Sequence, residues 1–244
     1  MRNTWLIARR EFGSYFATPV AYVFVAIFLI LSGVFTFFVG NLFDRGQADL
    51  LPFFNFHPWL YLFLVPAIAM RSWAEERKAG TIELLMTLPI SVAEAVIGKF
   101  IAAWMVVGLA LLLTFPLWLT VNYLGAPDNG IIATAYLGSW LMAGAFLAIG
   151  TCMSAFTKNQ VIAFILSIVV CFLFVVSGSG FVIDAFRAWS ANIVIDTVAS
   201  FSFLTHFEAM AKGVLALNDV AYFVLVMVVW LYASLIVVDL KKAD

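Results

Sequence analysis

The sequence predicts an all-α integral membrane protein, and three observations support that prediction. The 244-residue chain is 65% hydrophobic and only 11% charged, whereas soluble domains are about 45–50% apolar and about 25% charged. Its mean hydropathy is +1.08. Apolar stretches long enough to cross a bilayer core of about 30 Å, which takes about 20 helical residues, recur along the chain. We therefore expect a single membrane domain over residues 1–244.

Six apolar stretches predict six transmembrane helices. They are Val20–Val39, His57–Arg71, Phe100–Val121, Ile131–Phe156, Val161–Val182 and Val220–Val238. The second stretch is the shortest, and we expect its helix to continue into the polar segment that follows.

The first 19 residues predict a helix that lies in the membrane interface. Between Thr4 and Thr18, large apolar side chains recur at helical spacing, while Arg9 and Arg10 fall largely elsewhere on the helical wheel. This pattern is typical of an amphipathic helix on the inner leaflet. The alternative is a plain basic flank for the first span.

The distribution of Lys and Arg predicts the orientation. Ten lie on one side of the predicted spans and three on the other, and the positive-inside rule assigns the richer side to the cytoplasm. With six spans, both termini are then cytoplasmic. The ten are Arg2, Arg9, Arg10, Arg71, Arg77, Lys78, Lys99, Lys158, Lys241 and Lys242, and the three are Arg45, Arg187 and Lys212.

The cytoplasmic segment between the second and third spans, residues 72–93, concentrates charge in a chain that otherwise avoids it. Its charged side chains include Glu75, Glu76, Arg77, Lys78 and Glu83. At its end, Ser91 and Glu94 form a capping box that starts the helix of the third span.

Glycine and proline divide this charged segment into short helices. Gly80 is expected to end the helix that leaves the second span, because glycine accepts the left-handed conformation found at helix C-termini. Thr81 can then cap a short helix, Ile82–Leu88, which ends at Pro89. A helix this short is marginal alone. We expect either a docking element held by a partner protein or a polar loop resting on lipid headgroups.

Residues 183–219 are too polar to span the bilayer and too apolar to form a free loop. We expect short helices at the outer interface, where the aromatic side chain of Trp189 fits well. His206 and Glu208 are polar members of this outer segment. For His206, and for His57 near the same face, a capped or solvated role is expected rather than metal ligation.

The composition of the spans argues against several function classes. No Asp, Glu, Lys or Arg falls near a predicted midplane, which argues against a proton- or sodium-coupled carrier. The sequence has neither the H-E-x-x-H motif of zinc proteases nor the G-x-x-x-x-G-K-[ST] phosphate loop, so we expect no catalytic residue, metal or cofactor bound by this chain. Cys152 and Cys171 fall in apolar runs and fit a packing role. The net charge of −1 argues against a nucleic-acid partner.

The stretch E-E-R-K-x-G-T-I-E-L-L-x-x-x-P-I-S-x-x-E-x-x-x-G-K, from Glu75 to Lys99, resembles the signature of ABC type-2 export permeases. The stretch His206–Phe223 resembles the gliding-motility-type permease subfamily. Leu215–Asp219 departs from that subfamily, which tends to have an acidic residue and an Arg before the Asp. The resemblance covers essentially the whole chain.

This resemblance implies that the short cytoplasmic helix is a coupling helix, which inserts into a separate P-loop ATPase subunit. ATP and Mg would be bound by that ATPase, and this chain would be a non-catalytic permease subunit in the lipid bilayer. The residues implied at the ATPase contact are Gly80, Thr81, Glu83 and Leu84, with Glu75, Glu76, Arg77 and Lys78 positioning the helix and Lys158 in a second, smaller contact.

The resemblance also implies residence in the bacterial inner membrane and a second permease, either another copy or a homologue. Residues 183–219 would gate a path between the two units. It leaves open the substrate and an auxiliary single-pass membrane protein. Three alternatives remain: a permease that serves maturation of a periplasmic metalloenzyme, of the nitrous-oxide reductase type, a stand-alone channel or carrier, and a structural membrane subunit.

Overall fold

The computed structural model describes residues 2–82, 89–180, 182–183 and 197–241, and these residues form helices and no strand. The helices are α1 (Arg2–Ala17), α2 (Pro19–Val34) with the π-helical turn η1 (Phe35–Val39), α3 (Leu51–Asn55), α4 (His57–Ala69), α5 (Arg71–Ala79), α7 (Val92–Leu112), α8 (Phe115–Leu124), α9 (Asn129–Phe156), α10 (Gln160–Val176), α13 (Phe203–Ala211) and α14 (Leu217–Leu240). The predicted helix Ile82–Leu88 lies outside the described residues except for Ile82.

Four helical segments are long and apolar enough to cross a membrane. They are Pro19–Val39, Val92–Leu124, Asn129–Phe156 and Leu217–Leu240. The other two predicted spans correspond to shorter helices, because α4 has 13 residues and α10 has 17. α10 ends at Val176, six residues before the predicted Val182.

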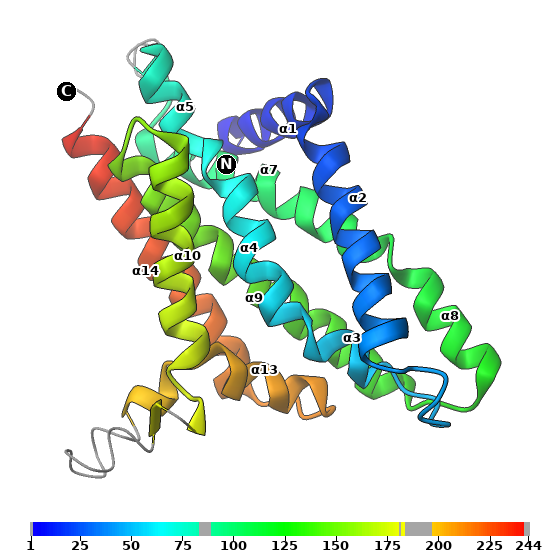
Figure 1. The fold of residues 1–244 in the computed structure, drawn as a ribbon. Helices are drawn as coiled ribbons and strands as arrows, with labels where there is room; N and C mark the ends of the chain where they lie inside the picture. The colour runs from blue at the N-terminus through cyan, green and yellow to red at the C-terminus, as the bar shows by residue number, and fades with distance from the viewer. Residues whose placement is uncertain (1, 83–88, 181, 184–196, 242–244) are drawn as a thin grey trace.

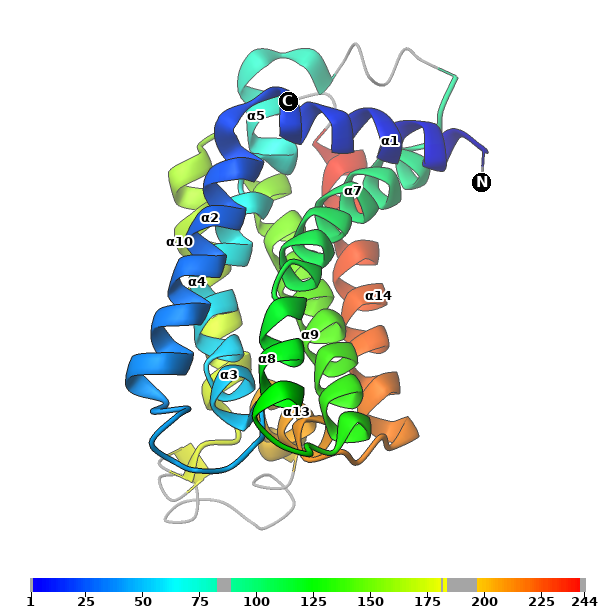
Figure 2. The ribbon, with the colours of Figure 1, turned by 90° about the vertical axis from the view of Figure 1, so that its right-hand side faces the viewer.

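Helix α9 forms the centre of the bundle, and small residues let its neighbours approach closely. A Cβ placed on Gly150 would lie 2.4 Å from the Cβ of Ala69 in α4, and one on Gly144 would lie 2.6 Å from the sulfur of Met227 in α14. Small residues at helix crossings are typical of membrane bundles, where close backbone approach strengthens van der Waals packing. Figure 1 and Figure 2 show α9 enclosed by α4, α7, α10 and α14.

Helix α1 does not run with the bundle but lies across one end of it (Figure 1 and Figure 2). It packs on α7 at Gly98, where a Cβ would lie 2.8 Å from the side chain of Ile7 and 3.1 Å from the carbonyl oxygen of Thr4. Trp5 is 59% exposed, whereas Ala8 is fully buried. The apolar side chains of this helix are thus divided, with Ala8 packed on the protein and Trp5 exposed.

The two ends of the bundle differ in content. Both described ends of the chain, Arg2 and Lys241, lie at the end that carries α1 and α5, whereas α3 and α13 lie at the opposite end (Figure 1). We call these the terminal end and the distal end. The helix of the third predicted span begins where its capping box predicts: α7 begins at Val92, directly after Ser91, so Lys99 lies two turns inside the helix.

Candidate functional site

Helix α5 projects from the terminal end past α1 (Figure 1 and Figure 2). It stops because Gly80 adopts the left-handed conformation, with φ at 69°, and its backbone N–H donates to the carbonyl of Glu76. The Thr81 hydroxyl donates to the same carbonyl at 3.3 Å. Lys78, Ala79, Gly80 and Thr81 are exposed. We call α5 with Gly80, Thr81 and Ile82 the α5 arm; Glu83 and Leu84 lie outside the described residues.

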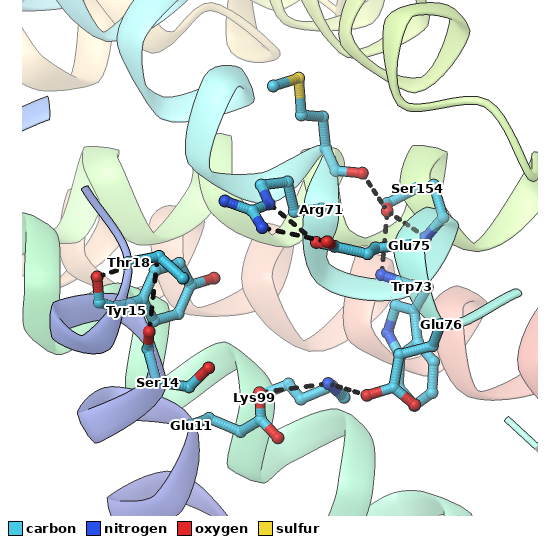
Figure 3. Close-up of polar contacts among 12 residues, drawn as sticks. Glu11, Ser14, Tyr15, Thr18, Arg71, Trp73, Glu75, Glu76, Lys99 and Ser154 are labelled. Atoms are coloured by element: carbon cyan, nitrogen blue, oxygen red, sulfur yellow. Dashed lines mark hydrogen bonds and ion pairs between the residues drawn. The ribbon is translucent and has the colours of Figure 1, made fainter. Parts of the chain in front are cut away.

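Lys99 is the ionic centre that joins three helices at this end (Figure 3). Its Nζ lies 2.7 Å from Glu76 Oε1 on α5 and 3.3 Å from Glu11 Oε2 on α1. The exposed fractions of these side chains are 6% for Lys99, 19% for Glu76 and 17% for Glu11. The ammonium also lies over the ring of Trp73, 5.5 Å from its centroid. One buried cation thus connects the arm, α1 and the start of α7.

The ion pairs around Glu11 shift its protonation equilibrium. Burial acts to raise the pKa of this carboxyl, but Lys99 and the guanidinium of Arg10, at 2.7 Å, outweigh burial and hold the pKa below its usual value. Glu11 therefore stays ionised in the folded protein, as its link to Lys99 requires.

A second ion pair lies on the surface of the arm. Arg71 donates to both carboxylate oxygens of Glu75, at 2.7 and 3.0 Å. This hydrogen-bonded pairing holds the pKa of Glu75 below its usual value. Because the Glu75 side chain is 47% exposed, the pair contributes little to stability.

Ser154 of α9 fixes the break between α4 and α5. Its hydroxyl accepts hydrogen bonds from the backbone N–H groups of Trp73 and Ala74, both at 3.0 Å, and donates to the carbonyl of Met70 at 2.8 Å (Figure 3). One buried side chain thereby satisfies backbone groups that the break would otherwise leave without partners. The arm and α9 are rigidly connected at this point.

The last turn of α9 receives two more contacts. Arg77 donates to the carbonyl of Ala155 at 2.8 Å, and Lys241 donates to the carbonyl of Phe156 at 2.8 Å. Cations at a helix C-terminus satisfy its free carbonyls and complement its dipole. The turn that contains Lys158 follows immediately, and the Asn159 side chain caps α10 by accepting from Val161 N at 2.9 Å.

The capping box predicted before the third span is present at the start of α7. The Glu94 backbone N–H donates to the Ser91 hydroxyl at 3.2 Å, and the Ser91 N–H donates to Glu94 Oε2 at 3.0 Å. Pro89 lies just before, in a bend. Ile82 is only 6% exposed and packs in a cluster with Trp73.

A cavity of about 570 Å³ separates α1 from the arm. Its walls include Ser14 and Tyr15 of α1 and Arg71, Glu75 and Thr81 of the arm. The Lys99 ion pairs with Glu11 and Glu76 lie in the wall of this cavity, so they connect α1 to the arm beside an open space.

The distal end holds His206 and Glu208, two of the three residues predicted for an outer gate. His206 Nδ1 lies 2.6 Å from Asp219 Oδ1 of α14, so this histidine is capped as expected. Glu208 pairs with Lys212 at 3.4 Å, and both side chains are more than 60% exposed. Trp189 lies outside the described residues. His57 differs from the expectation of a capped or solvated histidine at the surface, since it is fully buried against Phe residues with Nδ1 2.9 Å from the Ser139 hydroxyl.

The structure brings together part of the predicted contact set. Glu75, Glu76 and Arg77 lie on one short helix, and Gly80 with Thr81 forms its exposed end. Sequence reasoning missed Glu11, Trp73 and Ser154, and it treated Lys99 only as a member of the motif. Two signals could have pointed to the bridge. Glu11 is the only acidic residue in α1, and Lys99 follows Gly98, which the close packing of α1 requires.

In the part of the chain that the structure describes, no three His, Cys, Asp or Glu side chains are grouped to hold a metal ion. The terminal end instead presents an exposed arm joined by buried polar contacts to α1, α7 and α9. The described part of the chain has four apolar helical segments long enough to cross a membrane, and these define a multi-pass membrane protein.

Comparison with protein families gives the particular class. The sequence model described as ABC-2 family transporter protein matches residues 5–240, nearly the whole chain. The chain therefore belongs to the ABC-2 transporter family, whose permeases are membrane subunits that work with a partner ATPase subunit. No curated protein matches this chain in sequence.

Proposed function

We propose that this chain is the transmembrane permease subunit of an exporter, which couples ATP hydrolysis by a separate ATPase subunit to transport or force transmission across the inner membrane. The α5 arm carries this proposal: its exposed tip at Gly80–Thr81 precedes the proposed coupling helix, and its base is braced by Lys99 and Ser154. ATP and Mg bind to the ATPase, and this chain binds no cofactor.

The proposed mechanism passes movement along the arm. Closure of the ATPase pushes on Thr81–Leu88, with Lys158 in a smaller second contact. The arm transmits the push to α9 through Ser154 and Arg77, and to α1 and α7 through Lys99. Buried hydrogen-bonded contacts suit this role because they hold the arm in one geometry while the exposed tip stays available.

In this proposal the terminal end faces the cytoplasm, so the ATPase binds the arm on the side of the membrane where ATP is present. The basic residues of α1, α5 and the start of α7, together with Lys241, lie at that end, and Arg45 and Lys212 lie at the other. That distribution supports the orientation by the positive-inside rule. In the six-span topology, α4 with α5 and α10 complete the set of spans. This is supported by α4, which packs against both α2 and α10 (Figure 1).

A second permease, either another copy or a homologue, completes the unit. The path lies between the two, beside α2, α4 and α10, with residues 183–219 as the outer gate. Exposed large apolar side chains along α2 and α10, such as Ile30 at 63% and Leu173 at 63%, support contact with a partner or with lipid. We assign the chain to the gliding-motility-type subfamily, with an auxiliary single-pass protein as a candidate third component.

Capture of the ATPase tests the proposal. The tagged full chain, purified in detergent from its own cells, is expected to retain a P-loop ATPase identified by mass spectrometry. Glu83→Arg should abolish that capture, because it reverses a charge in the proposed contact. Glu208→Arg is the matched control, since it reverses an exposed Glu at the opposite end, and should leave capture unchanged.

Three results would contradict the proposal. Equal capture by both variants would place the ATPase elsewhere on the chain. Passage of solutes through liposomes that hold the chain alone, without ATP, would indicate a stand-alone channel. An ATPase rate of the complex that is the same with and without Thr81–Leu88 would indicate a structural subunit. A neighbouring gene for a periplasmic metalloenzyme would favour the maturation role over the gliding-motility type.

A further inference from the structure

At the distal end, a histidine that bridges two acceptors joins α13 to its neighbours. His206 Nδ1 lies 2.6 Å from Asp219 Oδ1, and His206 Nε2 lies 3.0 Å from the carbonyl oxygen of Ser200. The ring stacks on Tyr222 with centroids 3.9 Å apart. The side chains of His206 and Asp219 are 17% and 13% exposed. We call these two hydrogen bonds the distal tether.

Proton counting shows what the distal tether requires. A neutral imidazole has one N–H and one bare nitrogen, whereas imidazolium has two N–H groups. Both partners here are acceptors when Asp219 is ionised, so both bonds form together only if the pair holds one proton more than neutral His206 with ionised Asp219. Asp219 lies in the first turn of α14, where the helix dipole favours a carboxylate. The extra proton therefore resides on His206.

We infer that protonation of His206 ties residues 197–200 to α14 and that loss of this proton releases the Ser200 side of the tether. Without the proton, one ring nitrogen faces an acceptor with its lone pair, and one hydrogen bond must break. The charge-assisted bond to Asp219 is the shorter and stronger one. The bond to the Ser200 carbonyl is therefore the one lost.

The direction of the pH dependence follows from linkage. The tethered state holds one more proton than the released state, so falling pH favours tethering and rising pH favours release. Histidine is the side chain whose charge ordinarily changes near physiological pH. Residues 197–200 would thus respond to the pH of the compartment that they face.

Few other titratable groups face His206 in the part of the chain that the structure describes. From α14 these are Asp219 and Tyr222. The segment before α13 offers the Ser200 carbonyl, and α9 and α10 contribute aromatic rings, Phe146 and Phe174, that pack against Phe203. On α13 itself, Glu208 and Lys212 pair with each other in solvent. Asp184, Arg187 and Asp196 lie outside the described residues.

Release is confined to the segment that precedes α13. Phe203 is fully buried, and the Tyr222 hydroxyl donates to the carbonyl of Phe201 at 2.5 Å, independently of His206. These contacts hold Phe201 and the start of α13 in place when the proton leaves. Residues 197–200, which belong to the proposed gate, are therefore the residues whose attachment depends on the proton.

Hydrogen–deuterium exchange of the full chain in detergent tests this inference without ATPase or substrate, so it stands or falls independently of the exporter function. The measured quantity is the exchange rate of residues 197–202 in His206→Phe divided by that in the unchanged protein at the same pH, because intrinsic exchange chemistry cancels in this ratio. Phenylalanine keeps a ring against Tyr222 and removes both hydrogen bonds.

We expect a ratio of roughly five to ten at pH about 5.5 and near one at pH about 8.5, the effect of one lost hydrogen bond. In Asp219→Asn, residues 197–202 should exchange slowly at both pH values. The asparagine amide can donate to neutral His206 at Nδ1, while His206 Nε2–H still donates to the Ser200 carbonyl. Glu208→Gln, the control on the same helix, should keep the pH dependence of the unchanged protein.

A ratio that is the same at both pH values would overturn the inference, as would a pH dependence that persists in Asp219→Asn. Should His206→Phe fail to fold, seen as lost protection in α9, the comparison of Asp219→Asn with Glu208→Gln alone decides the question. In that comparison, a pH response equal in the two variants contradicts the proton-controlled tether.

Discussion

Lys99 and Glu76 form an ion pair of 2.7 Å whose lysine side chain is only 6% exposed. The pair joins the start of α7 to the middle of α5, and Glu11 of α1 completes it at 3.3 Å. The arm that we propose to meet the ATPase is thereby joined to the helix that lies across the bundle. A movement of the α5 arm or of α1 would therefore be passed to the other helix through the ammonium group of Lys99.

Lys99→Met should destabilise the protein strongly. The substitution nearly keeps the side-chain length but removes the cation from part-buried Glu76, and leaves Glu11 with Arg10 alone. The expected loss is up to about 3 kcal/mol, the lower end for a broken buried pair. The thermal unfolding midpoint of the full chain in detergent measures it. Lys78→Met removes an exposed lysine from the same arm and should change the midpoint little. The double variant Lys99→Met with Glu76→Met should be less unstable than additivity predicts; additive effects would contradict the bridge.

Acid should weaken the hold on α1 through Glu11. The pKa of Glu11 is lowered in the folded state by Lys99 and Arg10 despite burial, so its contribution to stability is present above the ordinary glutamate pKa and is lost as pH falls below about 4.3. The unfolding free energy of Glu11→Gln relative to the unchanged chain, measured in urea across pH, should therefore show a deficit that shrinks in acid. Asp44→Asn, at an exposed acid, should show no such trend. A deficit for Glu11→Gln that is constant with pH would argue against the ionic role.

Ser154→Ala should loosen the break between α4 and α5. Two buried backbone N–H groups, those of Trp73 and Ala74, lose their acceptor, at a cost of about 1–3 kcal/mol. Ser167→Ala is the matched control, because Ser167 is also buried but donates to the Ala163 carbonyl within its own helix. The unfolding midpoint should fall further for Ser154→Ala, and in the complex the ATPase rate should respond less to substrate. Equal shifts for the two variants would show that Ser154 has no special role.

Gly80→Ala should disturb the tip of the arm without any steric clash. A Cβ at Gly80 meets nothing within 4 Å, but φ is +69° there, and a left-handed conformation costs a non-glycine residue about 1 kcal/mol. Gly13→Ala is the control that distinguishes backbone strain from the steric effect of an added methyl group. A Cβ at Gly13 also meets nothing within 4 Å, but Gly13 lies in regular helix, where alanine is favoured over glycine. We expect weaker capture of the ATPase by Gly80→Ala and unchanged capture by Gly13→Ala. Unchanged capture by both variants would mean that the backbone at Gly80 does not set the direction of the arm.

Local signals in the sequence were reliable where a few adjacent residues decide the structure. The stop at Gly80 and the capping box of Ser91 with Glu94 depend on side chains within four positions of the backbone groups that they satisfy. Long apolar helices followed from composition in the same way. The length of α10 was predicted less well, because hydropathy alone does not place a helix end.

The sequence by itself determined the class: apolar runs must be buried in lipid as helices, since a bilayer offers no partners to an open backbone. It also determined where charge gathers, because each ionisable group in the hydrocarbon costs several kcal/mol. Only the tertiary structure decided which charges meet. Glu11, Glu76 and Lys99 are far apart along the chain, and Ser154 lies about 80 residues from the N–H groups that it accepts from. Their contacts arise because close helix packing at Gly98 and Gly150 sets the distances between helices, and no local pattern encodes those distances.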